Sequence, residues 1–129
     1  MATSTPGGAK TNLGLEPNVA GLLCYVPCCI GLVFSVVAAI VEKQSRFVRF
    51  HAFQSLLLHA VALVLAIGLN VAQFALTAVG LGFVGLLLSL VAMVVGVAFL
   101  GLTIFMMIKA NAAEEFELPV AGPLAHQWA

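Results

Sequence analysis

Residues 50–108 read FHAFQSLLLHAVALVLAIGLNVAQFALTAVGLGFVGLLLSLVAMVVGVAFLGLTIFMMI and contain no Asp, Glu, Lys or Arg. A helix of about 20 apolar residues crosses the hydrocarbon core of a bilayer. One helix cannot use this length, whereas two helices of about 25 residues and a tight turn can. Glycines cluster in residues 77–82, and glycine accepts the backbone conformations that turns require. The stretch therefore predicts two transmembrane helices, over about residues 52–77 and 83–108.

A second uncharged stretch, residues 19–41, precedes a short charged segment. It is long enough to span a bilayer, and longer than the about 7–15 apolar residues of a cleaved signal peptide. Pro27 should bend this helix, because it cannot donate a hydrogen bond to the carbonyl of Leu23. The predicted fold is an all-α membrane protein with three transmembrane helices, over about residues 19–41, 52–77 and 83–108.

Composition supports lipid as the solvent. The chain has 129 residues, of which 63% are hydrophobic and 8% charged, against about 45–50% and about 25% in average soluble proteins. Residues 1–18 are rich in Gly, Pro, Ser, Thr and Asn and predict a flexible N-terminal tail. Residues 19–108 form the predicted transmembrane domain. Residues 109–129 predict a polar C-terminal tail that is not one helix, because it contains Pro119 and Pro123.

The sequence carries no recognisable catalytic or cofactor motif, and we expect neither an enzyme nor a bound cofactor. Its net charge of zero gives no general attraction for nucleic acid. Cys24, Cys28 and Cys29 all lie in the first apolar run and lack metal-ligand or CxxC spacing. We interpret them as small residues of the helix core, with no metal site.

The distribution of basic residues predicts the orientation. With three crossings, Lys43, Arg46, Arg49 and Lys109 lie on one side of the membrane and only Lys10 on the other. Because basic residues favour the cytoplasmic side, we expect a multi-pass protein of the plasma membrane with its N-terminus outside and its C-terminus cytoplasmic.

Polar residues of the second span share one face. At 100° per residue the face is about 80° wide and predicts a packing seam with hydrogen bonds across helices. Its members are Ser55, His59, Asn70, Gln73 and Thr77. His59 is the one ionisable side chain within a span. It is interpreted as a structural hydrogen-bonding group, with a proton or ligand role as the alternative.

Residues 45–55, SRFVRFHAFQS, predict a short amphipathic interfacial segment before the second span. Aromatic rings recur every three residues beside two arginines, as in segments that lie among lipid headgroups. The residues expected to contact anionic headgroups or a partner are Arg46, Phe47, Arg49, Phe50, His51 and Gln54. An ordinary basic anchor at the start of a span is the simpler reading. Ion pairing of the arginines with Glu114, Glu115 and Glu117 is another.

A family resemblance rests on the same segment. Glu42, Lys43, Phe47–Ala52, Gln54 and Ser55 resemble the "EK-x-x-x-FVRFHA-x-QS" hallmark of widespread prokaryotic small membrane proteins of unknown function. Residues 113–125, AEEFELPVAGPLA, are similar to the family's "GEEYKLPIIGDLA"-type ending, with Ala113 in place of its first glycine. That group is distantly similar to the Tic twenty-kilodalton subunit of the plastid protein-import channel, whose "FVRF-x-x-x-Q" segment matches Phe47–Phe50 and Gln54.

The resemblance implies a membrane protein and little about activity. The leading hypothesis is a structural or interaction component, either alone or as a homo-oligomer, that contacts anionic lipid or a membrane-protein partner. The alternative that the Tic resemblance implies is a subunit of an oligomeric protein-translocation or channel complex. A weaker alternative is a small-solute or proton carrier that uses His59, Asn70 and Gln73.

Overall fold

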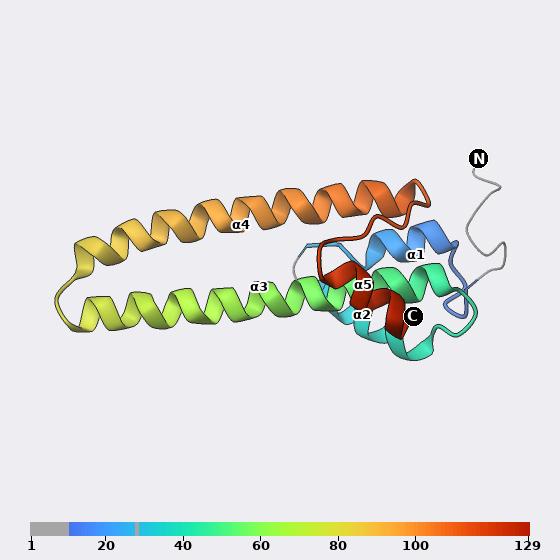
Figure 1. The fold of residues 1–129 in the computed structure, drawn as a ribbon, viewed down its shortest axis with the longest axis horizontal. Coiled ribbons are helices and arrows are strands. Elements are labelled where there is room, and N and C mark those ends of the chain that lie inside the picture. Colours follow the sequence, from blue (N-terminus) through green and yellow to red (C-terminus); the bar gives the residue numbers. More distant parts are fainter. Residues whose placement is uncertain (1–10, 28) are drawn as a thin grey trace. The chain divides into compact units, whose positions relative to one another are not determined.

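The computed structural model describes residues 11–27 and 29–129, and the chain is all-α in this part. Its helices are α1 (Pro17–Leu23), α2 (Cys29–Val41), α3 (Arg46–Ala78), α4 (Gly82–Asn111) and α5 (Ala121–Trp128), shown in Figure 1. The chain divides into two compact units. The packed unit comprises the described residues up to His59 together with Thr103–Ala129, and the hairpin unit is Ala60–Leu102.

The hairpin unit contains the later part of α3, a tight turn and the earlier part of α4 (Figure 1). The turn is where the glycines predicted it. Gly80 has φ +82°, Gly80 N–H donates to Thr77 O at 3.1 Å, and Leu81 N–H donates to Leu76 O at 2.8 Å. These bonds satisfy the last carbonyls of α3 in the manner of a glycine-terminated helix. The two predicted spans are therefore confirmed as helices that a turn connects, although each helix extends beyond the predicted limits.

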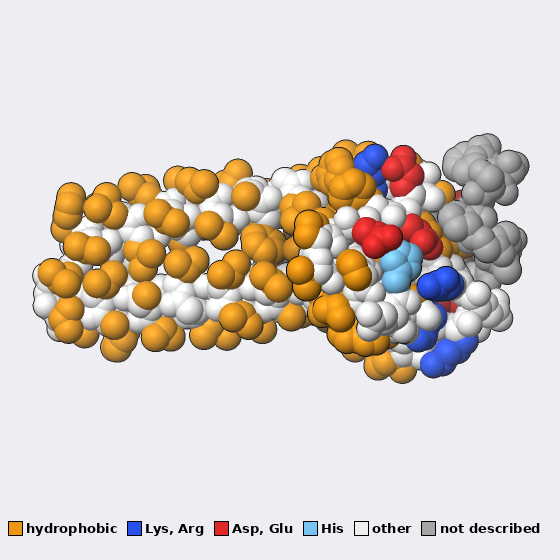
Figure 2. Space-filling model, viewed as in Figure 1, with side chains coloured by type: hydrophobic (Ala, Val, Ile, Leu, Met, Phe, Trp, Pro, Cys, Tyr) orange, Lys and Arg blue, Asp and Glu red, His pale blue; other side chains and the backbone are white. Residues whose placement is uncertain are grey.

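Both long helices have the length and polarity of membrane spans. α3 has 33 residues and α4 has 30, and only 11% and 6% of their most apolar stretches are buried. A core helix of a soluble protein would be mostly covered by the rest of the chain. Figure 2 shows hydrophobic side chains over the visible surface of the hairpin unit. Such an exposed apolar surface fits lipid as its surroundings.

The first apolar run does not form the single helix that was predicted over residues 19–41. It forms α1, of 7 residues, and α2, of 13 residues, and neither reaches the about 20 residues that a bilayer requires. α1 ends before Pro27, whose ring has no N–H to donate and excludes a continuing helix. Three transmembrane helices are thus not confirmed, and the described residues include two candidate spans.

The first run also folds back on itself. The Ser35 hydroxyl of α2 donates to Cys24 O, just after α1, at 3.0 Å. A Cβ atom built on Gly31 would overlap with Val26 O, so glycine is required where the break packs against α2. At the predicted bend near Pro27 the chain therefore reverses direction, and α2 packs back against the segment that follows α1. Cys24 is buried as expected, Cys29 is exposed, and Cys28 lies outside the described residues.

The ends of this run lie together. Asn12 N–H donates to the Glu42 carboxylate at 2.8 Å, and Lys43 N–H donates to the Asn12 side-chain oxygen at 2.7 Å. The Asn18 amide donates to Asn111 O, at the end of α4, at 3.3 Å. These contacts contradict the predicted placement of the residues before the run across the membrane from residues 42–49. Of the predicted flexible tail, residues 1–10 lie outside the described part, and α1 begins at Pro17.

α3 begins at Arg46, so residues 46–51 are not the separate interfacial segment that was predicted. Ser45 caps the helix, since its hydroxyl accepts from Val48 N–H at 3.3 Å. The Glu42 carboxylate accepts from Gln44 N–H at 2.8 Å and Ser45 N–H at 2.9 Å. No Gly or Pro occurs between Arg46 and Ile67, and the helix continues into the span.

Candidate functional site

The polar residues of the family-like segment lie inside the packed unit. His51, Gln54 and Ser55 stand at i, i+3 and i+4 on α3, so they share one face of the helix. All three side chains are fully buried, as are Phe47 at 2% exposure and Phe50. These four side chains, which were predicted to contact lipid headgroups, are therefore covered by the rest of the packed unit. They are Phe47, Phe50, His51 and Gln54. Burial of so many polar groups requires partners for each of them.

Tyr25, in the break after α1, connects His51 and Gln54. The Gln54 amide donates to the Tyr25 hydroxyl at 3.0 Å, and that hydroxyl lies 3.0 Å from His51 Nδ1. His51 Nε2 lies 3.0 Å from the carbonyl oxygen of Glu114, which can only accept. His51 thus donates from Nε2 and accepts from Tyr25 at Nδ1, and the three side chains form one continuous network.

The other contacts of Gln54 hold the C-terminal tail. Its amide donates to Phe116 O at 2.9 Å, and its side-chain oxygen accepts from Leu118 N–H at 2.8 Å. One carboxamide thus pairs with the backbone on both sides of Glu117, as a neighbouring strand would. Together with the His51 contact at Glu114, these bonds fasten the extended tail to α3. The side chains of His51 and Gln54 bind backbone atoms of the tail, and the tail's side chains do not take part in these bonds.

Ser55 holds the broken helix. Its hydroxyl donates to Cys24 O at 2.5 Å, the same carbonyl that accepts from Ser35. The hydroxyl groups of Ser35 and Ser55 thus both bind the carbonyl of Cys24, and they join α2 and α3 to the segment that follows α1. His59, one turn further along α3, lies with Nδ1 2.8 Å from Ser55 O. His59 bonds within its own helix, which agrees with a structural role.

Aromatic rings close the site around His51. Its ring centroid lies 4.5 Å from Phe47, 5.1 Å from Phe50 and 5.6 Å from Tyr25, each with the edge of one ring toward the face of the other. Such packing favours a fixed, dry site. The arrangement can join three parts of the chain, but it offers no exposed group for chemistry.

The predicted basic residues lie at the end of α5. Arg49 donates to Trp128 O at 3.1 Å and to Glu42 O at 2.9 Å, and Arg46 donates to His126 O at 3.5 Å. Cations at a helix C-terminus are favoured because the last carbonyls there carry partial negative charge. The His126 ring stacks on Phe50 at 4.2 Å. The start of α3 thus fixes the position of α5, in a tail that was correctly predicted not to be one helix.

The predicted ion pairing of these arginines with the acidic tail is not observed. Glu114 pairs with Lys109 at 2.8 Å, and Glu117 pairs with His126 at 3.1 Å. The acidic residues are directed to those partners because His51 and Gln54 fix the tail backbone between them. The arginines instead bind backbone carbonyls, which use some of their donors and do not neutralise their charge.

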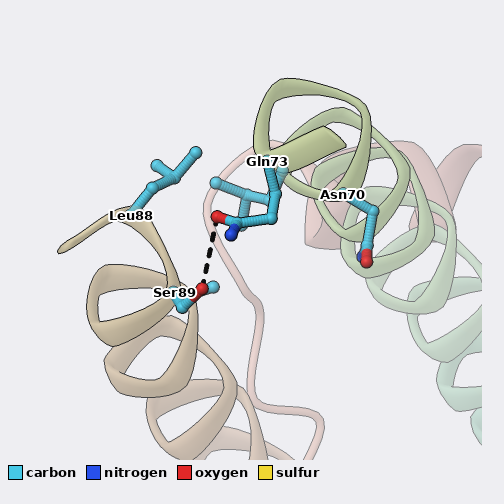
Figure 3. Close-up of a pocket in the computed structure, with 6 residues that line it drawn as sticks. Asn70, Gln73, Leu88 and Ser89 are labelled. Atoms are coloured by element: carbon cyan, nitrogen blue, oxygen red, sulfur yellow. Dashed lines mark hydrogen bonds between the residues drawn. The ribbon is translucent and has the colours of Figure 1, made fainter. Parts of the chain in front are cut away.

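The later members of the predicted polar seam belong to the hairpin unit. Gln73 accepts a hydrogen bond from Ser89 of α4 at 3.2 Å, so this residue does bond across helices (Figure 3). Asn70 donates to Ala66 O and Thr77 to Gln73 O, both within α3. A Cβ atom on Gly85 would lie 2.9 Å from the Gln73 amide, so a side chain at this position would require the carboxamide to move. In this unit Gln73 thus makes the predicted bond across helices, whereas Asn70 and Thr77 bond within α3.

Sequence reasoning missed Tyr25, Asn12 and the structural role of Glu42. Glu42 is fully buried and its carboxylate accepts three backbone N–H groups, from Asn12, Gln44 and Ser45. An acidic residue shortly before a predicted helix start could have indicated this role, because a carboxylate is favoured near the free N–H groups there. The tyrosine carried no comparable signal, because its partners lie 26 and 29 residues away.

Relatives of this chain are described as membrane proteins. A membrane protein of Methanocaldococcus jannaschii in the UPF0132 group is 37% identical over 119 residues, which cover 92% of this chain and 94% of that protein. A UPF0132 membrane protein of Archaeoglobus fulgidus is 34% identical over 113 residues, covering 88% and 95%. No solved structure matches the chain. These matches do not show the resemblance to the Tic subunit.

Residues 15–125 match the family described as the magnetosome magnetite crystal formation protein family. This range includes the broken first run, both long helices and the tail that His51 and Gln54 bind. The chain therefore belongs to this family, and the match extends over most of its sequence rather than over a single motif.

Proposed function

We propose that this chain is a non-catalytic interaction component of the plasma membrane that recruits anionic lipid to one membrane face. In this proposal α3 and α4 cross the bilayer, and the first apolar run enters and leaves on the same side. Lys43, Arg46, Arg49 and Lys109 then flank the spans on one side, which the distribution of basic residues assigns to the cytoplasm.

The lipid proposal rests on three basic side chains that have no carboxylate partner in the described part of the chain. Among the described residues, Lys43, Arg46 and Arg49 form no ion pair with a carboxylate, whereas Lys109 does. Glu42, nearest in sequence, is buried and its oxygens face backbone N–H groups. Figure 2 shows Lys and Arg side chains gathered on one part of the packed unit. Phosphate groups of lipid are the partners that such a surface lacks.

Aromatic residues border the same surface. The Arg49 guanidinium lies 5.4 Å from the Phe53 ring centre, and Trp128 packs edge-on against Phe53 at 5.9 Å. Trp128 is 47% exposed. Tryptophan at the end of a span prefers the boundary between headgroups and hydrocarbon. The basic residues would therefore lie at headgroup depth, with lipid phosphate within reach of Arg46.

The family name refers to magnetite formation, and the archaeal relatives are described only as membrane proteins. Within residues 11–27 and 29–129 no group of three or more His, Cys, Asp or Glu side chains is placed to hold a metal ion. We propose for this chain the membrane setting of the archaeal relatives.

Arg46→Gln should lower the preference of the protein for phosphatidylglycerol over phosphatidylcholine by about fivefold. This corresponds to about 1 kcal/mol for one basic residue at an anionic surface. The measurement is the fraction of spin-labelled lipid of each kind that the protein immobilises in mixed bilayers. Lys109→Gln is the matched control, since Glu114 already pairs with that ammonium, and it should change the preference less. Equal affinity of the unmodified protein for both lipids would refute the proposal.

A further inference from the structure

The hairpin unit contains a hollow between α3 and α4 that nothing in the described chain fills. One part has a volume of about 130 Å³ and is lined by Asn70, Gln73 and Ser89 among others. A second part, of about 280 Å³, is lined by Asn70, by larger apolar side chains and by four small residues, Ala62, Ala66, Ala92 and Gly96. Both parts lie within residues 60–102, the uncharged portion of the two candidate spans.

Asn70 is the polar group that both parts of the hollow share. Its amide donates to Ala66 O at 2.7 Å, and among the described residues nothing donates to its side-chain oxygen. Figure 3 shows Gln73 joined to Ser89, while no dashed line reaches Asn70. Asn70 is exposed, so within a bilayer it would face hydrocarbon unless another molecule covers it. A polar group without a partner in hydrocarbon is costly.

We propose that a second copy of this chain covers this face, with the α3 helices of two copies in contact and their Asn70 side chains hydrogen-bonded to each other. Copies inserted in the same direction can be related by a two-fold axis along the membrane normal. A residue near such an axis meets its own copy at the same depth. A carboxamide has both a donor and an acceptor, so two of them form a reciprocal pair.

The shape of the hollow suits this occupant. Ala62 and Ala66 precede Asn70 on α3 at intervals of four residues, so all three lie near one line along the helix. Small residues on both walls let another helix approach closely, which drives association where the hydrophobic effect cannot. An acyl chain could fill the apolar part, but it has no group that could donate to Asn70.

This inference rests on the proposed interaction role, but it can fail independently of it. If copies pair in this way, the contact involves the hairpin unit, whereas lipid selection depends on Arg46 in the packed unit. A variant at Asn70 should therefore weaken self-association and leave the phosphatidylglycerol preference unchanged. Loss of the lipid preference with pairing intact would refute only the lipid proposal.

The test combines two measurements on the full chain in bilayers. Asn70→Leu should raise the dimer dissociation constant, measured by energy transfer between labelled copies, by about tenfold, which is equivalent to about 1.4 kcal/mol. Thr77→Val is the matched control, because the Thr77 hydroxyl bonds to Gln73 O of its own helix. It should leave the constant unchanged. Equal effects of the two substitutions would overturn the assignment to Asn70.

Disulfide formation provides the second measurement and does not depend on the Asn70 substitution. In a chain whose native cysteines are replaced by alanine, Ala66→Cys should form a cross-linked dimer on oxidation, since it lies about 40° from Asn70 around α3. Gly68→Cys, about 160° away, has open space around its Cβ and should not cross-link. A monomeric protein that retains a lipid in the hollow, or cross-linking at both positions alike, would overturn the proposal.

Discussion

Gln54→Leu is expected to release the C-terminal tail and to lower the free energy of unfolding by about 2–6 kcal/mol. The substitution removes the partners of Phe116 O and Leu118 N–H, and each buried backbone group left without a partner costs about 1–3 kcal/mol. It also removes a donor from the Tyr25 hydroxyl. Since a whole domain is stabilised by about 5–15 kcal/mol, the loss is a large part of the total.

The measurements for Gln54→Leu are thermal unfolding in mild detergent and cleavage by a glutamate-specific protease. Glu114, Glu115 and Glu117 lie in the fastened tail, so cleavage there should accelerate when the tail detaches. Gln44→Leu is the matched control, because its side chain is exposed on the loop before α3. Unchanged cleavage in the Gln54 variant would show that the carboxamide does not hold the tail.

Glu42→Gln should destabilise the packed unit by about 1.5–3 kcal/mol for each charge-assisted hydrogen bond that is lost. A carboxylate only accepts, and here its two oxygens receive three backbone N–H groups, one on Oε2 and two on Oε1. A carboxamide has a single accepting oxygen and directs an NH₂ group toward at least one of those donors. The link between the segment at Asn12 and the start of α3 should therefore open.

Hydrogen exchange measures this effect directly. The amides of Asn12, Gln44 and Ser45 should exchange faster in the Glu42→Gln protein, together with a lower unfolding temperature. Glu115→Gln makes the same chemical change at an exposed position and should alter neither quantity. Protection of the three amides at the original level would contradict the role assigned to the Glu42 carboxylate.

The two long helices could be predicted because their signal is local. Each needs only an uncharged run of sufficient length, and Gly80 provides the backbone conformation that the turn requires. The reversal of the first run could not be predicted in the same way. An apolar run that crosses the bilayer and one that turns back can have the same hydropathy. What distinguishes them is contacts between residues far apart in sequence, such as Ser55 with Cys24 O.

The family-like segment illustrates the same difference. Its aromatic and basic spacing fits an interfacial helix, yet Phe47 and Phe50 are buried because His51 and Gln54 bind the tail on the same side. The C-terminal tail also differs from the similar family ending at one position. Ala113 adopts φ +61° where the similar family ending has glycine, and this left-handed conformation ends α4. A side chain makes that conformation costlier than glycine would, by about 1–2 kcal/mol.

The side of the membrane reached by Glu16 tests the reversal of the first apolar run most directly. Single cysteines at Glu16, Gln44 and Val79, in a chain without native cysteines, can be labelled with an impermeant maleimide in oriented vesicles. All three positions are exposed. We predict that Glu16→Cys and Gln44→Cys react from one side and Val79→Cys from the other. Reaction of the first two from opposite sides would mean that the run crosses the bilayer and would contradict the account.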